Sequence, residues 1–209
     1  MSTDNTSTQH WNTIYQSKNE NEVSWYQEYP ATSIDLILKL KLPLSAPIID
    51  IGGGESHLAD ALLDLGYTNI SVLDISEKAL EKSKNRLGEK SKLVKWIVTD
   101  VTEFKPTEKY DLWHDRAAFH FLITEEHIET YISIAKKTIN LNGFLIIGTF
   151  SENGPVKCSG LDIKQYTNES LNDKFGNSFN QIYFQYSDHS TPFGTTQNFL
   201  FCTFKNEAT

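Results

Sequence analysis

Cysteine is scarce in this chain of 209 residues, and its two cysteines, Cys158 and Cys202, lie far apart in the sequence. Such a pair fits neither a disulfide framework nor the spacing of a zinc site, so we expect no metal centre. No apolar run approaches membrane-spanning length, and the polar N-terminus lacks the apolar core of a signal peptide. We therefore expect a cytoplasmic protein with no membrane partner.

Basic residues are in the minority, because 19 Lys and Arg face 27 Asp and Glu and leave a net charge of -8. Binding a phosphate backbone requires a basic face, so a nucleic-acid partner is not expected. The hydrophobic fraction of 39% and the length of 209 residues suit one soluble domain with a sizeable core. Nothing in the composition indicates an oligomeric state.

One stretch organises the rest of the chain, namely Ile48-Ile49-Asp50-Ile51-Gly52-Gly53-Gly54-Glu55. Apolar β-forming residues run into three glycines, and an apolar pattern with helical spacing follows from Leu58. The pattern predicts a buried strand, a tight turn and a helix that packs back on the sheet. The glycines allow a ligand to lie against the backbone near the helix N-terminus.

Strand and helix patterns then alternate, which predicts a parallel sheet with helices on both faces. The expected strands are residues 48–51, 70–75, 93–98, 110–115 and 144–150, and a helix runs from Thr124 to Asn142-Gly143. A short helix near 169–175 and two aromatic strands, 182–186 and 198–204, follow as an antiparallel pair. The predicted fold is therefore α/β and Rossmann-like, a doubly wound, mostly parallel seven-stranded sheet with an antiparallel C-terminal edge hairpin.

We divide the chain into a tail and one domain. Residues 1–9 are polar and predicted to be disordered, and residues 10–209 form the domain. Within the domain we expect an N-terminal helical lid over 10–45 and a cofactor-binding core over 46–150. Residues 151–209 supply a substrate-side loop and the C-terminal strands.

Four successive strands each finish at a carboxylate, namely Asp50, Asp74, Asp100 and Asp115. Open α/β sheets bind ligands outside the carboxyl ends of their strands, so these acids are expected at one site. Asp74 stands where an acid accepts hydrogen bonds from both ribose hydroxyls, and Asp100 is placed to hold an adenine amine. Ile75 and Trp96 are candidate apolar walls. The ligand implied is an adenine nucleoside.

The glycine turn departs from the dinucleotide fingerprint, which needs a third small residue where His57 stands. Glu55 beside the glycines would repel a pyrophosphate but suits a ligand with an ammonium or sulfonium group. No lysine follows as in a phosphate-binding P-loop. An NAD-dependent oxidoreductase and a non-catalytic nucleoside-binding module are therefore the weaker interpretations.

These residues together resemble the class I S-adenosylmethionine-dependent methyltransferases, over residues 10–150 and on towards the C-terminus. Asp50 to Gly54 resembles their first motif, and residues 111–115 resemble their fourth-strand motif. The resemblance implies S-adenosylmethionine as cofactor and methyl transfer as activity. It also implies a set of cofactor-binding residues: Asp50, Gly52, Gly53, Gly54, Asp74, Ile75, Asp100, Val101 and Asp115.

Subfamily features point two ways. The sequences His10-Trp11-Asn12-x-x-Tyr15 and Ser24-Trp25-Tyr26 resemble the elongation-factor lysine methyltransferases, which carry Asp-Lys-Gly where this chain has Asp115-Arg116-Ala117. The Asp-Arg pair is more similar to the thiopurine and tellurite methyltransferases, in which the arginine lies near the acceptor. That resemblance makes Arg116 a catalytic candidate. We favour a small-molecule acceptor, and a protein lysine is the alternative.

Three further features have two interpretations each. Trp11, Tyr15 and Trp25 form either a lid that contacts the cofactor or an aromatic cap on the core. Possible general bases are His114, His120, His127 and His189, of which His120 is the better candidate, although a structural histidine competes. Alternation along the strand should turn His114 away from the face that Asp115 occupies. Cys158 either borders the acceptor pocket or is a buried small residue.

Overall fold

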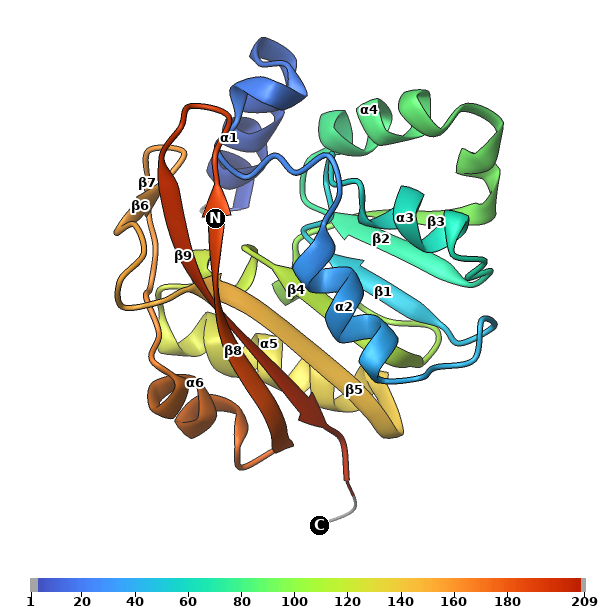
Figure 1. The fold of residues 1–209 in the computed structure, drawn as a ribbon, viewed down its shortest axis with the longest axis vertical. Coiled ribbons are helices and arrows are strands. Elements are labelled where there is room, and N and C mark those ends of the chain that lie inside the picture. Colours follow the sequence, from blue (N-terminus) through green and yellow to red (C-terminus); the bar gives the residue numbers. More distant parts are fainter. Residues whose placement is uncertain (1–3, 208–209) are drawn as a thin grey trace.

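A seven-stranded sheet forms the centre of the computed structural model, which describes residues 4–207 (Figure 1). The strands follow the order β3-β2-β1-β4-β5-β9-β8 across the sheet. Their bounds are β1 (Ile48–Ile51), β2 (Ile70–Asp74), β3 (Val94–Val98), β4 (Tyr110–Arg116), β5 (Ile139–Phe150), β8 (Asn180–Ser190) and β9 (Thr196–Lys205). The predicted fold class is confirmed.

Strands β1 to β5 pair in parallel, and the last two add antiparallel pairs at one edge. Ile48 of β1 lies beside Ile70 of β2 on one side and beside Leu112 of β4 on the other. The chain therefore winds outwards from β1 in both directions. The gap between the ends of β1 and β4 is the switch point at which such sheets bind ligands.

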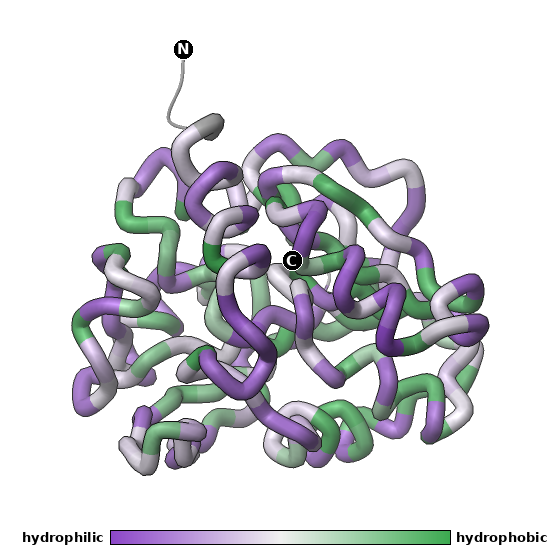
Figure 2. Tube along the Cα trace, turned by 90° about the horizontal axis from the view of Figure 1, so that it is seen from above, coloured by the Kyte–Doolittle hydropathy of each residue, from purple (hydrophilic) through white to green (hydrophobic). Residues whose placement is uncertain are grey.

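Helices cover both faces of the sheet, as the alternation of buried residues along the strands requires. In β1, Ile48 joins the core under α2 (Ala31–Lys39), α3 (Leu58–Asp64) and α4 (Glu77–Leu87), whereas Ile49 joins the core under α5 (Glu125–Thr138) and α6 (Asn168–Phe175). Figure 2 shows hydrophilic and hydrophobic stretches alternating along the chain, as expected for elements with one buried side.

The helix after Thr124 begins as predicted but ends earlier. The Thr124 hydroxyl accepts a hydrogen bond from the His127 N–H at 3.3 Å, which is the expected N-cap. The prediction that this helix continues to Asn142-Gly143 is wrong, because the backbone turns extended at Ile139 and enters β5. The Asn206 amide donates to the Ile139 carbonyl at 2.9 Å and so replaces helical pairing there.

The N-terminal helix α1 (Asp4–Ser17) overturns the predicted disordered tail from residue 4 onwards. Residues 1–3 of that predicted tail lie outside the described residues. The Asn12 amide oxygen accepts hydrogen bonds from the Ser76 hydroxyl at 2.8 Å and from the Lys78 N–H at 3.3 Å. These contacts join α1 to the start of α4, and Figure 1 shows α1 beside the upper edge of the fold.

Shorter elements complete the chain. A two-stranded sheet, β6 (Lys157–Cys158) with β7 (Leu161–Asp162), was not predicted and lies in the loop after β5. Short 3₁₀ helices occur at η1 (Glu20–Glu22), η2 (Gly88–Leu93), η3 (Val101–Glu103) and η4 (Phe119–Phe121). Within residues 4–207, no helix combines the length and apolar character that crossing a membrane requires.

Candidate functional site

A cavity of about 450 Å³ opens at the carboxyl ends of β1, β2 and β4. Its walls come from these strand ends, η3, α1, the segment 18–30 and the β6–β7 hairpin. Within the predicted lid over 10–45, helix α2 packs mainly on the sheet and not over the cavity. The predicted site residues that line the cavity are Trp11, Tyr15, Trp25, Asp50, Gly52, Gly53, Asp74, Ile75, Asp100, Val101 and Arg116.

The glycine turn has no room for side chains. A Cβ atom at Gly53 would lie 2.6 Å from Asp50 Oδ2 and 2.6 Å from Val72 Cγ1. Gly52 and Gly54 have φ angles of +63° and +43°, which side chains disfavour. Gly54 does not line the cavity, which corrects its predicted place among the cofactor-binding residues, and a Cβ atom there would lie 2.9 Å from Asp74 Oδ2. The turn therefore presents bare backbone to the cavity.

Asp74 ends β2 with its carboxylate beside the turn. Its Oδ1 accepts a hydrogen bond from the Ser76 N–H at 2.7 Å, and the Gly54 backbone donates another. Burial raises the pKa of Asp74 to about 7, and the nearby charge of Asp50 acts in the same direction. A ligand with hydroxyl donors would favour the ionised carboxylate.

Asp100 lines the cavity one strand further along the sheet. Its Oδ1 accepts hydrogen bonds from the Thr102 N–H at 2.7 Å and from the Thr102 hydroxyl at 2.6 Å. These bonds start η3 and hold the carboxylate at the end of β3. Ile75 and Val101 add apolar surface near the two acids, whereas the predicted wall residue Trp96 turns away and donates its Nε1–H to the Ser91 carbonyl at 2.9 Å.

Asp50, His114 and Ser33 form a buried hydrogen-bonded chain along the cavity wall. His114 Nδ1 lies 2.7 Å from Asp50 Oδ1, and His114 Nε2 lies 2.9 Å from the Ser33 hydroxyl. The chain joins β1, β4 and α2. His114 does face away from Asp115, as the alternation predicted.

Asp115 does not line the cavity, which corrects its predicted place among the cofactor-binding residues. Its Oδ2 accepts the Tyr131 hydroxyl of α5 at 2.7 Å, and its Oδ1 accepts the Ala118 and Phe119 N–H groups. Burial raises the pKa of Asp115 to about 6. These bonds fix the turn after β4, where Ala117 has a φ of +71°. Asp115 thus holds the backbone next to the cavity without contacting the cavity itself.

An aromatic cluster formed by Trp11, Tyr15, Trp25 and Phe121 closes one side of the cavity. The Trp11 ring lies edge-on to Trp25 at 5.7 Å between centroids and to Phe121 at 5.1 Å. Tyr15 lies 6.2 Å from both tryptophans. All four residues line the cavity, so the cluster covers the site as well as packing on the core.

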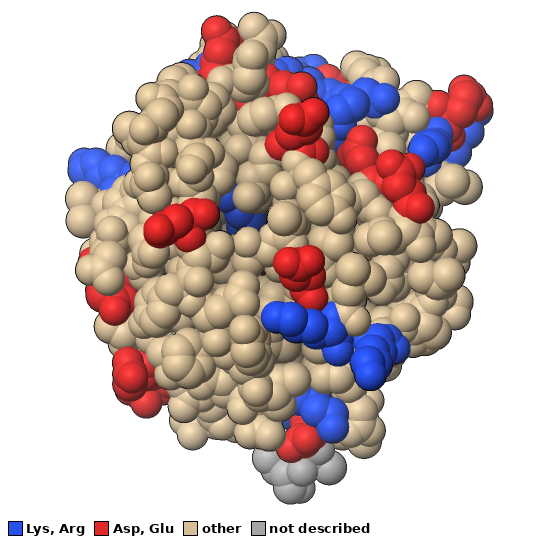
Figure 3. Space-filling model, viewed as in Figure 1, with Lys and Arg blue, Asp and Glu red and all other residues tan. Residues whose placement is uncertain are grey.

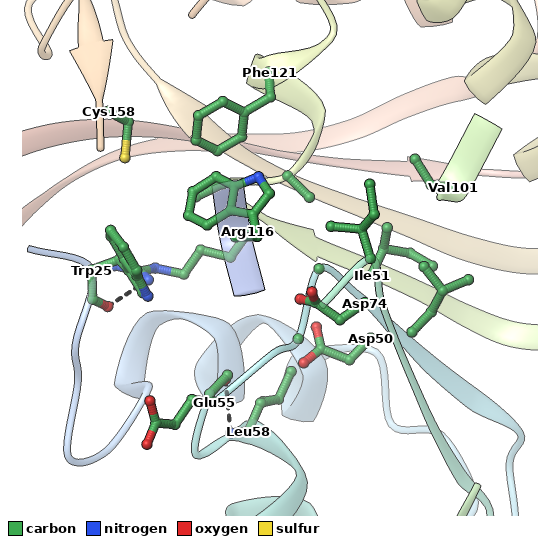
Figure 4. Close-up of a pocket in the computed structure, with 18 of the residues that line it drawn as sticks. Trp25, Asp50, Ile51, Glu55, Leu58, Asp74, Val101, Arg116, Phe121 and Cys158 are labelled. Atoms are coloured by element: carbon green, nitrogen blue, oxygen red, sulfur yellow. Dashed lines mark hydrogen bonds between the residues drawn. The ribbon is translucent and has the colours of Figure 1, made fainter. Parts of the chain in front are cut away.

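Arg116 extends from the end of β4 into the side of the cavity that the aromatic cluster covers. Its Nη1 donates to the Trp25 carbonyl at 3.1 Å, and its guanidinium lies 4.7 Å from the centre of the Phe199 ring. Figure 4 shows the carboxylates of Asp50 and Asp74 together on one side and Arg116 beside Trp25 on the other. Burial lowers the pKa of Arg116 to about 10, so it stays charged at neutral pH.

The predicted base His120 lies behind the wall and does not line the cavity. Its Nδ1 accepts the Phe150 N–H at 3.4 Å, and burial lowers its pKa to about 3. His120 is therefore neutral and structural, which corrects its choice as the better base. His189 also has a lowered pKa and lies 2.7 Å from the Ser24 carbonyl, whereas His127 and Cys158 line the cavity.

Sequence reasoning missed a polar network at the mouth of the cavity. His57 Nε2 lies 3.1 Å from Glu20 Oε2, and Lys82 donates to Glu55 Oε2 at 3.2 Å. Burial raises the pKa of Glu55. The two pairs join residues 37 and 27 positions apart in the sequence, so no local pattern indicates them. Figure 3 shows charges of both signs scattered over the face in view, with basic atoms also at the bottom of a hollow.

Residues 48–143 match the family model described as a methyltransferase domain. The mouse eEF1A lysine and N-terminal methyltransferase is 23% identical over 143 residues, which cover 68% of this chain and 20% of that protein. The chain thus spans about a fifth of the length of this curated relative and of its bovine and human counterparts.

Solved structures have the same fold. One, from work on the conversion of a disulfide bond into a thioacetal group during echinomycin biosynthesis, has a TM-score of 0.78 and 15% identity and covers 96% of this chain and 93% of its own. Another is the 1,6-didemethyltoxoflavin-N1-methyltransferase of Burkholderia thailandensis with its substrate and S-adenosylhomocysteine bound. Its TM-score is 0.69 at 17% identity, over 97% of this chain and 85% of that chain.

Proposed function

We propose that this chain, in which residues 48–143 match a methyltransferase domain, is a class I S-adenosylmethionine-dependent methyltransferase. It would transfer a methyl group from S-adenosylmethionine to a small-molecule nucleophile by in-line displacement. One observation carries the proposal. The glycine turn, Asp74 and Asp100 border the same cavity as the aromatic cluster and Arg116. A nucleoside-binding side and an acceptor side therefore meet in one cavity.

The residues present fit the cofactor. The Asp74 carboxylate would accept hydrogen bonds from the ribose hydroxyls, and Asp100 would accept one from the adenine amine. The bare backbone at Gly53, where a Cβ atom would collide with Asp50, would allow the amino-acid end to lie against the turn. When bound, S-adenosylmethionine supplies an electrophilic methyl group on a sulfonium.

The task of this chain is then mainly positioning. The cavity walls must hold the acceptor in line with the sulfur–methyl bond and exclude water, which together can supply about 7–11 kcal/mol of the barrier. The aromatic cluster would serve both purposes, because aromatic faces attract cations such as a sulfonium. Its four rings close the cavity over the glycine turn.

A proton acceptor is needed only for an acceptor atom that carries a proton. Among the histidines, His114 fits this task best, because its Nε2 meets the Ser33 hydroxyl at the cavity wall and its Nδ1 meets Asp50. His120, with a pKa of about 3 and no place in the cavity wall, does not fit it. An anionic acceptor requires no base at all.

A protein lysine is the alternative acceptor, and the curated relatives favour it. The charge at the acceptor side opposes it, because the Arg116 guanidinium would repel a lysine ammonium. NAD is disfavoured by Glu55, whose carboxylate lines the cavity beside the turn and would repel a pyrophosphate.

Calorimetry with S-adenosylmethionine and with NAD tests the cofactor. We expect S-adenosylmethionine to bind and NAD not to bind, and the reverse result would refute the proposal. Incubation with S-adenosylmethionine carrying a tritiated methyl group in a cell lysate then tests the acceptor. We expect the label in the small-molecule fraction, and label confined to protein would establish the alternative.

A further inference from the structure

The two arginines of this chain have opposite surroundings. Arg86 forms a two-pronged ion pair with Asp60, at 3.1 Å and 2.8 Å, and also donates to the Ser56 carbonyl. Arg116 forms no ion pair with any carboxylate among the described residues. Its buried Nη2 atom has no hydrogen-bond partner within that part of the chain. Arg116 is therefore a cation whose charge is not compensated locally.

The titratable groups next to Arg116 are all neutral at pH 7. Burial raises the pKa of Cys158 to about 11, and burial lowers the pKa of His120 to about 3. The pKa of His189 is also lowered, first by burial and then by the charge of Arg116. The charge of Asp50 also acts on Arg116, but Asp50 forms no ion pair with it, and the Asp50 carboxylate is bonded to His114. Among the described residues, no neighbouring group forms an ion pair with the guanidinium.

Keeping such a cation in a partly closed cavity is unfavourable unless something pairs with it. The rest of the guanidinium environment does not pair with its charge, because the Trp25 carbonyl uses one Nη1–H group and the Phe199 ring covers one face. The remaining Nη1–H and the two Nη2–H groups are the donors that a two-oxygen anion accepts side by side.

The position of Arg116 favours the acceptor over the cofactor. Its contacts come from the segment before α2, from β9 and from β6, through Trp25, Phe199 and Cys158. Asp74 and Asp100, which fit the nucleoside, lie on the other side of β1, at the ends of β2 and β3. Figure 4 shows Arg116 extending away from Asp74, towards Trp25.

We propose that the methyl acceptor is a small anionic molecule, bearing a carboxylate or a similarly compact anion that pairs with the Arg116 guanidinium. This inference rests on the proposed function, because it concerns the acceptor of that reaction. It narrows the acceptor from any small nucleophile to an anion, and it gives Arg116 a binding role that neither Lys82 nor Arg86, with their carboxylate partners, can fill.

Formate, a small planar anion, is the probe for the first experiment. The protein is titrated with sodium formate by calorimetry, with and without saturating S-adenosylhomocysteine, while sodium chloride, which offers no two-oxygen anion, keeps the ionic strength constant. We expect saturable formate binding in the wild type, at least tenfold weaker binding in Arg116→Met, and partial retention in Arg116→Lys, which keeps the charge without the fork.

Lys157→Met is the matched control, since it removes a positive charge next to Cys158 from an exposed residue that pairs with Asp162. Formate binding should survive in this variant. Formate binding in Arg116→Met equal to that of the wild type overturns the inference. A loss of S-adenosylhomocysteine affinity in Arg116→Met as large as the loss of formate affinity also overturns it, because Arg116 would then hold the cofactor carboxylate.

The second experiment fractionates an unlabelled cell extract. Small molecules from the extract are separated on an anion-exchange and a cation-exchange resin at pH 8, and each fraction is offered as acceptor with the tritiated cofactor. Acceptor activity retained only by the anion exchanger supports the inference, and activity that passes through it overturns the inference. If no fraction accepts label and S-adenosylmethionine does not bind, the proposed function fails. The formate titration of the ligand-free protein then still decides whether Arg116 binds a small anion.

Discussion

Cofactor affinity should fall as the pH falls below 7, because Asp74 must be ionised to accept hydrogen bonds from the ribose. Burial holds the pKa of Asp74 at about 7 in the free protein, far above the usual value for aspartic acid. At pH 8 the carboxylate is mostly ionised, whereas at pH 6 only about one tenth is, so binding must first displace a proton. We expect the dissociation constant for S-adenosylmethionine to rise about tenfold from pH 8 to pH 6.

Calorimetry in two buffers of different ionisation enthalpy measures both the affinity and the protons released. Close to one proton should leave per cofactor bound at pH 6, and almost none at pH 8. Asp74→Asn should bind about 1–3 kcal/mol more weakly at pH 8, the range for a lost hydrogen bond to a charged group, and should lose most of the pH dependence. 5′-Methylthioadenosine, which lacks the titrating amine of the cofactor, serves as the control ligand.

The raised pKa of Asp74 affects folding stability in the opposite direction, because ionising this carboxylate strengthens cofactor binding but lowers the free energy of unfolding. An aspartic acid whose folded-state pKa is raised contributes stability that is present below pH 4 and is lost as the pH rises through 7. Asp74→Asn should therefore raise the free energy of unfolding at pH 8, measured by chemical denaturation without ligand.

The binding measurement decides the role of Asp74. A dissociation constant for S-adenosylmethionine that stays flat between pH 6 and pH 8, or that keeps its pH dependence in Asp74→Asn, would refute the assignment of Asp74.

Three further variants test other parts of the site. Gly53→Ala should abolish cofactor binding and lower the free energy of unfolding by about 1–3 kcal/mol, because the new Cβ atom would collide with Asp50 and Val72. Cofactor affinity equal to that of the wild type would contradict this prediction. His120→Asn should destabilise the fold but leave the pH profile of turnover unchanged, whereas a lost inflection would make His120 a base. Trp11→Ala should weaken binding of cationic S-adenosylmethionine more than that of neutral-sulfur S-adenosylhomocysteine, and equal losses in calorimetry would exclude a cation–π contact.

The sequence predicted those parts of the fold that depend on local patterns, namely hydrophobic periodicity and position at a strand end. Alternation of apolar strands and amphipathic helices gives the sheet, and the carboxyl end of each strand gives Asp50, Asp74 and Asp100. The same rule also included Asp115, because a strand-end position does not tell which face a side chain takes. Tyr131 of α5 accounts for Asp115, and that contact joins residues 16 apart in the sequence.

Polarity misled the reading of the N-terminus. A run of Ser, Thr, Asn and Gln has too little apolar character to predict order, yet α1 begins at Asp4. The order comes from tertiary contacts, since Asn12 accepts hydrogen bonds at the start of α4 and Trp11 packs into the aromatic cluster. Neither contact has a signature in the sequence before the fold is known.

Burial depth and charge balance are the properties that sequence cannot supply, and they separate the two catalytic candidates. His120 follows Arg116 by four residues and carries the usual chemistry of a base, but burial lowers its pKa to about 3. Arg116 was a candidate by resemblance alone, and its significance lies in the carboxylate that its surroundings lack. A buried ion pair would have made Arg116 structural. Its uncompensated charge makes it the residue through which the acceptor is best sought.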